Sequence, residues 1–232
     1  MKRVATPILA LALGTLLAQG AFAANAVRIS QVYGGGGGST GTYLYDYVEL
    51  FNATGSAVNI GGWALEYGSA AGNWGSSAIN IFNFPSGTSI AACSYLLIQL
   101  GTVGTAGAVF PVTPDFTSAN LSMSQSNGKV ALFNATNANV ACGSEAAGTL
   151  VDKVAYGTGN CPEGTATAAL TSTTTAVRNS GGLTDTDNNL PDFSLSSTPA
   201  VTMHNAASGA SPTCLSVPAR TSTWGRLKLL YR

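Results

Sequence analysis

One stretch, residues 43–67, constrains the fold more than any other, and it reads YLYDYVELFNATGSAVNIGGWALEY. Its first half has the composition of a β-strand from Asp46 to Asn52, with no helical spacing of apolar residues. Side chains alternate between the two faces of a strand, with Val48 and Leu50 on one face and Tyr47, Glu49 and Phe51 on the other. A strand that is apolar on both faces belongs inside a β-sandwich rather than at its rim.

Turn residues follow this strand and recur throughout the chain. Asn52-Ala53-Thr54-Gly55 and Gly61-Gly62 separate the strand from Trp63. Other short runs of strand character are 27–33, 79–84, 95–100, 130–136 and 150–156, whereas residues 101–128 read as a long irregular connection. Only 9% of the residues are charged and 28 are glycine, which suits short strands joined by many turns. We therefore predict an all-β sandwich of roughly seven to nine strands with almost no helix after Ala23.

The N-terminus has the pattern of a secretory signal peptide, residues 1–23. Lys2-Arg3 precedes an apolar run from Val4 to Leu17, and Ala21-Phe22-Ala23 supplies small residues before a cut after Ala23. A transmembrane helix is the weaker alternative, because Gly and Pro interrupt a run that is short for a bilayer. We expect a secreted, extracellular protein with no membrane span after the signal is removed.

Export changes the meaning of the four cysteines. In an oxidising compartment they favour two disulfides, for which three pairings exist. A zinc site is disfavoured, since the chain has no CxxC pair and only one histidine, His204. We predict a bond between Cys142 and Cys161, which flank the strand at 149–156, and by exclusion a bond between Cys93 and Cys214.

Charge is distributed unevenly along the chain. Residues 25–219 contain four basic residues and all ten carboxylates, and four minus ten gives a net charge of −6. Such a body is a poor match for nucleic acid, whose binding depends on neutralising phosphates. The last segment, Arg220–Arg232, holds four basic residues and no acid. We expect this segment to be a mobile end left by truncation or frameshift of a longer gene.

A glycine run spans residues 34–38 and continues as Ser39-Thr40-Gly41. It has no Gly-Lys-Ser/Thr ending and no following helical pattern, so a phosphate-binding loop is disfavoured. We predict a flexible crossing loop.

Two motifs resemble one family. The order D-Y-V-E-L-F-N, short turn, V-N-I-G-G-W-A-L is similar to the opening of a bacterial lamin tail domain. The order V-D-K-V-A-Y-G, N-C-P-E-G, D-T-D-N-N-L-P-D-F is similar to its closing half. The resemblance implies an immunoglobulin-like β-sandwich over residues 24–205, followed by an irregular tail at 206–232. It also implies export, and such domains in many bacteria precede an extracellular nuclease domain.

Alternating oxygen side chains near the end of that domain suggest calcium. Asp185, Asp187 and Asn189 alternate, and Asp192 follows, in the manner of a chain that wraps Ca²⁺ with oxygens. However, Leu190 stands where calcium loops need Gly, and Ser196 stands where they need a bidentate Glu. The alternative is an Asx-rich turn whose carboxylates bind backbone amides. Calcium is the only cofactor that the sequence suggests.

The residues do not define a catalytic site. Asp46 and Glu49 are three apart on a strand, so they face opposite sides, and Glu49 is expected to be a structural acid. His204 lies in a Ser/Ala/Pro-rich tail. We therefore predict a non-enzymatic binding or scaffolding module whose partner is a protein, a polysaccharide or a nucleic acid. The alternatives are the accessory part of an extracellular, DNA-degrading endonuclease without its catalytic domain, and a structural surface protein.

Overall fold

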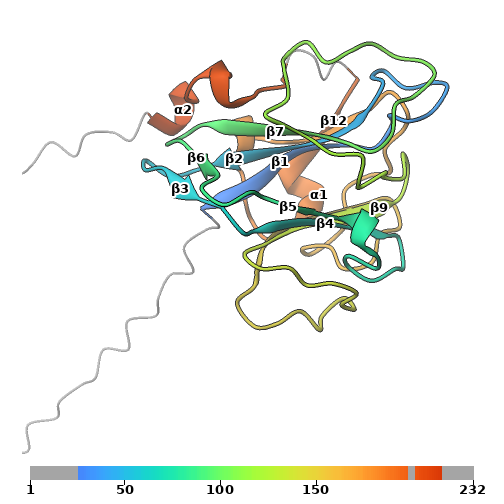
Figure 1. The fold of residues 1–232 in the computed structure, drawn as a ribbon, viewed down its shortest axis with the longest axis horizontal. Coiled ribbons are helices and arrows are strands. Elements are labelled where there is room, and N and C mark those ends of the chain that lie inside the picture. The colour runs from blue at the N-terminus through green and yellow to red at the C-terminus, as the bar shows by residue number, and fades with distance from the viewer. Residues whose placement is uncertain (1–25, 198–201, 216–232) are drawn as a thin grey trace, which may run out of the picture.

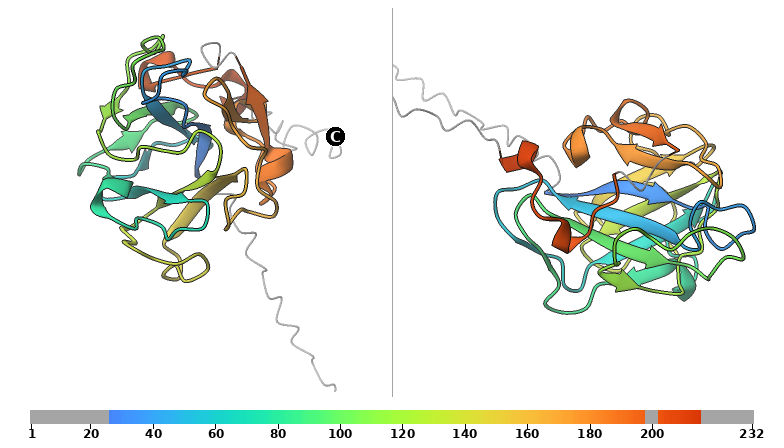
Figure 2. Two further views of the ribbon diagram at one scale, coloured as in Figure 1. Left: turned by 90° about the vertical axis from the view of Figure 1, so that its right-hand side faces the viewer. Right: turned by 90° about the horizontal axis from the view of Figure 1, so that it is seen from above.

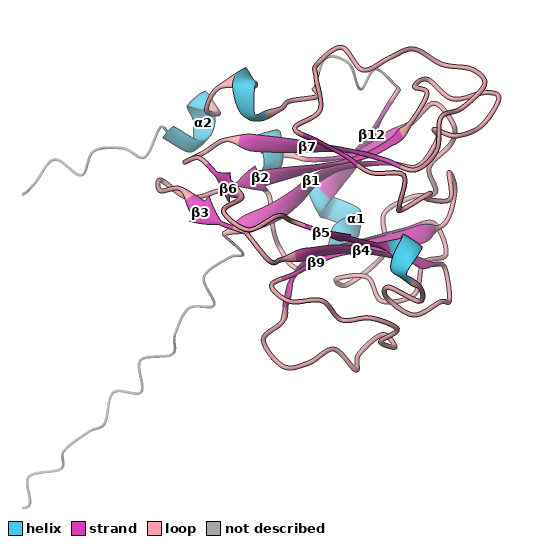
Figure 3. Ribbon diagram, in the orientation of Figure 1, coloured by secondary structure: helices cyan, strands magenta, loops and turns pink. Residues whose placement is uncertain are grey.

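The computed structural model describes residues 26–197 and 202–215, and β-strands dominate them (Figures 1 and 3). The strands are β1 (Val27–Tyr33), β2 (Asp46–Asn52), β3 (Val58–Asn59), β4 (Ala64–Ser69), β5 (Ile81–Asn83), β6 (Ser89–Ile90), β7 (Tyr95–Leu100), β8 (Phe116–Thr117), β9 (Gly128–Phe133), β10 (Leu150–Tyr156), β11 (Thr175–Arg178) and β12 (Phe193–Ser196). The helical pieces are η1 (Ala78–Asn80), η2 (Ser180–Gly182), α1 (Asn189–Asp192), η4 (Ala206–Ser208) and α2 (Pro212–Leu215). These pieces span only three or four residues each, so the all-β prediction is confirmed.

Two sheets form the sandwich (Figure 2). One has the strand order β12-β11-β1-β2-β7-β8, with only β8 parallel to its neighbour, and the other has the order β10-β9-β4-β5. A third pair, β3 with β6, lies at one end. The described residues hold twelve strands, more than predicted, because β3, β6 and β8 have two residues each and leave no pattern in the sequence.

The main core lies between the two sheets and follows from the alternation in β2. Val48 and Leu50 are fully buried in one cluster with Leu65 of β4 and Val130 and Leu132 of β9. Burial of each such side chain stabilises the fold by about 1.5–3 kcal/mol. Since β2 pairs with β1 on one side and β7 on the other, it is the interior strand that the sequence predicts.

The opposite face of the six-stranded sheet is also covered. Tyr47 packs with Tyr33 of β1, with Tyr43 of the loop before β2, and with Met203 from the C-terminal segment. Cys214 of that segment is bonded to Cys93, which lies just before β7. The domain was expected to end at Asn205, but the packing continues to Cys214. This second cover explains why Tyr47, Glu49 and Phe51 are as buried as the inner face.

The glycine run corrects the expectation of a flexible loop for its first three residues. A Cβ on Gly36 would lie 2.0 Å from the carbonyl carbon of Tyr45, and one on Gly35 would lie 2.5 Å from the carbonyl oxygen of Ser172. The glycines are therefore needed for close backbone approach. Gly38, by contrast, is exposed, with no atom within 4 Å of such a Cβ.

The expected signal peptide, residues 1–23, and the basic end, Arg220–Arg232, lie outside the described residues. Within the described part of the chain, no helix is long and apolar enough to span a bilayer.

Candidate functional site

A cavity of about 300 Å³ opens on the outer face of the six-stranded sheet. Strands β1 and β2 form its floor, with Ser30, Gln31 and Glu49. Its walls come from β7, from β11–η2–β12 and from residues 202–204, including Tyr95, Asn179, Ser180, Ser194 and His204. The volume is at the lower end of the range for small-ligand sites.

Glu49 is part of the floor, with 1% of its surface exposed. A bulge in β1 gives it two partners: Ile29 faces Leu50 and Gln31 faces Glu49, which leaves Ser30 as the extra residue. Ser30 Oγ donates a hydrogen bond of 2.7 Å to Oε1, and Gln31 Nε2 donates one of 3.1 Å to Oε2. Burial raises the pKa of the Glu49 carboxyl, although hydrogen bonds from His204 and Ser30 oppose the rise.

His204, which lies 155 residues after Glu49 in the sequence, contacts this carboxylate. Its backbone N–H donates to Glu49 Oε2 at 2.6 Å, and its Nδ1 lies 3.5 Å from the same oxygen. The ring stacks on Tyr95, with centroids 4.2 Å apart and planes at 17°. Nδ1 is buried with no hydrogen-bond partner among the described residues, whereas 35% of the side chain is exposed. A proton on Nδ1 would face Glu49, and the open part of the ring is then the Nε2 side.

Arg178 forms part of the wall, but its guanidinium is buried and directed at groups of the protein. Its Nε donates to the carbonyl of Ile29, and its Nη1 donates to the carbonyl of Thr184 and to Asp185. Its Nη2 donates to both carboxylate oxygens of Asp152, at 3.0 and 2.8 Å. All three side-chain nitrogens therefore donate to the protein, and the side chain has 0% of its surface exposed.

Of the four residues predicted to bind calcium, three have side-chain oxygens that already contact the protein, namely Asp185, Asn189 and Asp192. Asp185 pairs with Arg28 at 3.0 Å and with Arg178 at 3.3 Å. Asp192 accepts hydrogen bonds from the N–H and hydroxyl of Thr186, and its Oδ2 lies 3.8 Å from Arg178. Asp187 has a φ of 55°, a left-handed conformation that suits an Asx turn. The geometry favours the Asx turn over the calcium site.

Asn189, the fourth of these residues, faces the edge strand β10. Its Nδ2 donates to the carbonyl of Lys153 at 3.0 Å, and its Oδ1 accepts from the N–H of Ala155 at 3.0 Å. The carboxamide thus pairs with β10 as a short piece of neighbouring strand would. The structure therefore brings Asp185 and Asp192 to Arg178 but directs Asn189 to the second sheet.

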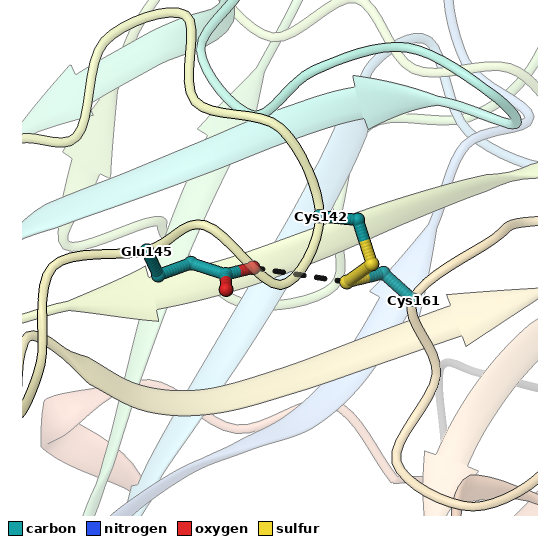
Figure 4. Close-up of side chains that lie close together, drawn as sticks. All are labelled: Cys142, Glu145 and Cys161. Atoms are coloured by element: carbon teal, nitrogen blue, oxygen red, sulfur yellow. Dashed lines mark hydrogen bonds between the residues drawn. A yellow bond between two sulfur atoms is a disulfide. The ribbon is translucent and has the colours of Figure 1, made fainter.

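A second polar cluster lies on the outer face of the four-stranded sheet (Figure 4). Cys142 is bonded to Cys161, and Glu145 Oε1 lies 3.7 Å from Cys161 Sγ. The same Glu145 oxygen accepts a 2.6 Å hydrogen bond from Trp74 Nε1. Cys142, Cys161 and Glu145 have the composition of a metal site, but bonded sulfurs offer no thiolate ligand. The cluster therefore fastens the loops that cover Trp74, and both disulfides join the cysteines paired in the sequence prediction.

Sequence reasoning missed most of the cavity. Tyr95, Asn179, Ser180 and Ser194 carry no motif, because the fold alone brings them together. The one available signal was an acid, Glu49, in the middle of a strand between apolar and aromatic residues, and its role as a buried structural acid agrees with the contacts.

Together the two sheets define an all-β, immunoglobulin-like sandwich. Residues 21–158, more than half of the chain, match the family model of the Lamin Tail Domain, and the chain belongs to that family. This domain is a non-catalytic, immunoglobulin-like module. No curated protein matches the chain. Among solved structures, a match is the crystal structure of a DUF4876 family protein from Bacteroides thetaiotaomicron VPI-5482. It is 12% identical, covers 74% of this chain and 71% of its own, and has a TM-score of 0.47.

Proposed function

We propose that the protein is a secreted, non-enzymatic binding module that holds its ligand in the cavity above Glu49. The observation that carries this proposal is the combination of an open cavity with a buried carboxylate and an imidazole at its floor and wall. Sites of this kind orient ligands through a few placed polar groups.

Binding is favoured over catalysis by the way in which Glu49 is used. Its two oxygens accept hydrogen bonds from Ser30, Gln31 and the backbone of His204, and Gln31 also donates to the carbonyl of Thr202. The carboxylate thus fixes the 202–204 segment on the sheet. Since its hydrogen-bonding capacity serves this purpose, we infer a positional role rather than proton transfer.

Export is supported by the two disulfides, which bridge 121 and 19 residues, and by the signal pattern at 1–23. Structural disulfides persist in oxidising compartments. Expression of the full chain in a bacterium should yield an extracytoplasmic product that begins at Ala24. Recovery of the uncut chain from the cytoplasm would contradict export.

Nuclear magnetic resonance with the isotope-labelled mature protein and a small-molecule fragment library tests the binding proposal. We expect fragments to shift backbone signals of β1, β11 and β12 around the cavity. Ser194→Trp, which fills the cavity, should remove these shifts, whereas Ser86→Trp, at an exposed turn between β5 and β6, should leave them unchanged. Shifts confined to other surfaces, or shifts that survive Ser194→Trp, would overturn the proposal.

A further inference from the structure

The two charged residues that line the cavity, Glu49 and Arg178, are buried and are not accessible to an ionic ligand. Each side-chain nitrogen of Arg178 donates to carbonyls or carboxylates of the protein, and the side chain has 0% of its surface exposed, so it cannot clamp an anion. Glu49 is 1% exposed and already accepts three hydrogen bonds from the protein, so its carboxylate is not accessible for pairing with a cationic ligand. A ligand must therefore be bound through neutral groups.

Hydroxyl groups on the walls retain unused hydrogen-bonding capacity of both kinds. Ser194 Oγ donates to Asn179 Oδ1 at 2.7 Å, which leaves its lone pairs available as acceptors. Ser180 Oγ accepts from Thr184 Oγ1 at 3.1 Å, which leaves its own proton available. Hydroxyl groups of a ligand can donate a hydrogen bond to Ser194 Oγ and accept one from Ser180 Oγ.

The remaining wall is flat and aromatic. The His204 ring lies on Tyr95, and Tyr95 is held in turn by a 2.9 Å hydrogen bond from its hydroxyl to the carbonyl of Gly181. In the tautomer whose Nδ1 proton faces Glu49, Nε2 of the imidazole accepts a hydrogen bond from a ligand hydroxyl. The wall thus offers an imidazole nitrogen for a hydrogen bond and, beside it, the apolar surface of the stacked rings. This combination suits a ring-shaped ligand that carries both C–H and O–H groups.

We propose that the cavity binds one uncharged sugar unit of a polysaccharide, with its hydroxyls on Ser180, Ser194 and His204. This inference names the ligand class for the proposed function and rests on it. The volume of about 300 Å³ limits the bound part to a single ring, so a longer chain would place only one unit inside.

Saturation-transfer nuclear magnetic resonance on the mature protein tests this ligand class. The probes are methyl β-D-glucopyranoside, methyl β-D-galactopyranoside and methyl α-D-mannopyranoside, with glucuronate, glucosamine and single-stranded DNA as charged comparisons. We expect at least one neutral glycoside to receive saturation and to shift the signals of β11, β12 and His204. Absence of saturation with all three neutral glycosides would overturn the inference.

Two variants locate the contact. His204→Phe retains a flat ring for Tyr95 and removes both ring nitrogens, so glycoside affinity should fall roughly tenfold. Ser194→Trp should abolish binding, and Ser86→Trp should not. Circular dichroism and intact disulfides would show that each variant folds, and equal affinity in His204→Phe would contradict the assigned contact.

The outcomes separate the two proposals. If fragments or charged probes occupy the cavity and neutral glycosides do not, the sugar class is wrong and the binding function stands. If nothing occupies the cavity in either experiment, both the binding function and the sugar ligand class are wrong.

Discussion

Asp152 and Arg178 together take the place of a neighbouring strand at the bulge of β1. Asp152 Oδ2 accepts a 2.5 Å hydrogen bond from the N–H of Ile29, and Arg178 Nε donates a 2.9 Å hydrogen bond to the Ile29 carbonyl. The two side chains pair with each other at 2.8 Å, and both are fully buried. Because Asp152 belongs to β10 and Arg178 to β11, the pair joins the two sheets through the same residue of β1.

Arg178→Met should therefore destabilise the protein strongly. The substitution leaves the buried Asp152 carboxylate without its partner, which costs about 3–5 kcal/mol in the free energy of unfolding. Urea unfolding measures this loss. Lys153→Met, which removes a less buried charge from β10, is the control and should cost less than about 1 kcal/mol. A variant Arg178→Met as stable as the wild type would show that the pair contributes little.

Stability should fall as the pH rises from 4 to 7. Burial raises the pKa of the Asp46 carboxyl to about 7, while hydrogen bonds from Met123 and Gly36 oppose the rise. The folded pKa lies above the unfolded value, so this stabilisation is complete below about pH 3.9 and is lost as the pH rises through 7. We expect the free energy of unfolding to fall by about 1 kcal/mol per pH unit in this window.

Asp46→Asn isolates that contribution. The amide cannot titrate, so the slope of stability against pH should become shallower, although Asn accepts at only one of its two side-chain atoms. Urea unfolding of both proteins at several pH values gives the two slopes. Identical slopes would assign the pH dependence to other acids with raised pKa values, such as the half-buried Glu163, whose pKa desolvation raises to about 8.

The two disulfides should contribute unequally. Replacing Cys142 and Cys161 together by Ala should cost about 3 kcal/mol, and replacing Cys93 and Cys214 should cost about 4–5 kcal/mol, because the second pair closes a far longer loop. Peptide mapping without reduction checks the linkage, and urea unfolding checks the order. Free thiols in exported protein, or the reverse order of stabilities, would contradict this account.

Calcium should not raise the melting temperature. Asp185 and Asp192 already face Arg178, and Asn189 pairs with β10, so a cation would have to displace these contacts. Thermal unfolding with and without millimolar Ca²⁺ tests this expectation. A rise that Asp187→Ala abolishes would instead establish the calcium site predicted from the sequence.

Deletion of Arg220–Arg232 should leave the melting temperature and both disulfides unchanged, as the composition of that end predicts. Deletion from Thr202 onward should lower the melting temperature, because it removes Cys214 and uncovers Tyr47 and Glu49. The longer deletion serves as the positive control. A loss of several degrees with the shorter deletion would make the basic end part of the domain.

The sequence predicts the inner core well and the outer face poorly, for a physical reason. Alternation along β2 places Val48 and Leu50 on one face and Tyr47, Glu49 and Phe51 on the other. The residues of each face can therefore be predicted from the sequence of the strand alone. The segment that covers the outer face cannot be predicted from the sequence, because Glu49 and His204 are 155 residues apart and no periodic pattern links them. Likewise, the sequence does not show whether a run of glycines provides mobility or allows two backbone segments to approach closely. The positions of Tyr45 and Ser172 in the fold show that close approach is the reason here.

The hydrogen bonds of Asn189 also bear on how the protein behaves at high concentration. β10 is the end strand of its sheet, and an end strand with free backbone groups is a template for pairing with another molecule. Asn189 occupies the groups of Lys153 and Ala155, and the N–H of Thr167 occupies the Ala155 carbonyl at 2.9 Å. In a protein with only 9% charged residues, a buried carboxamide and the backbone of Thr167 thus cover this part of the β10 edge and hinder edge-to-edge pairing.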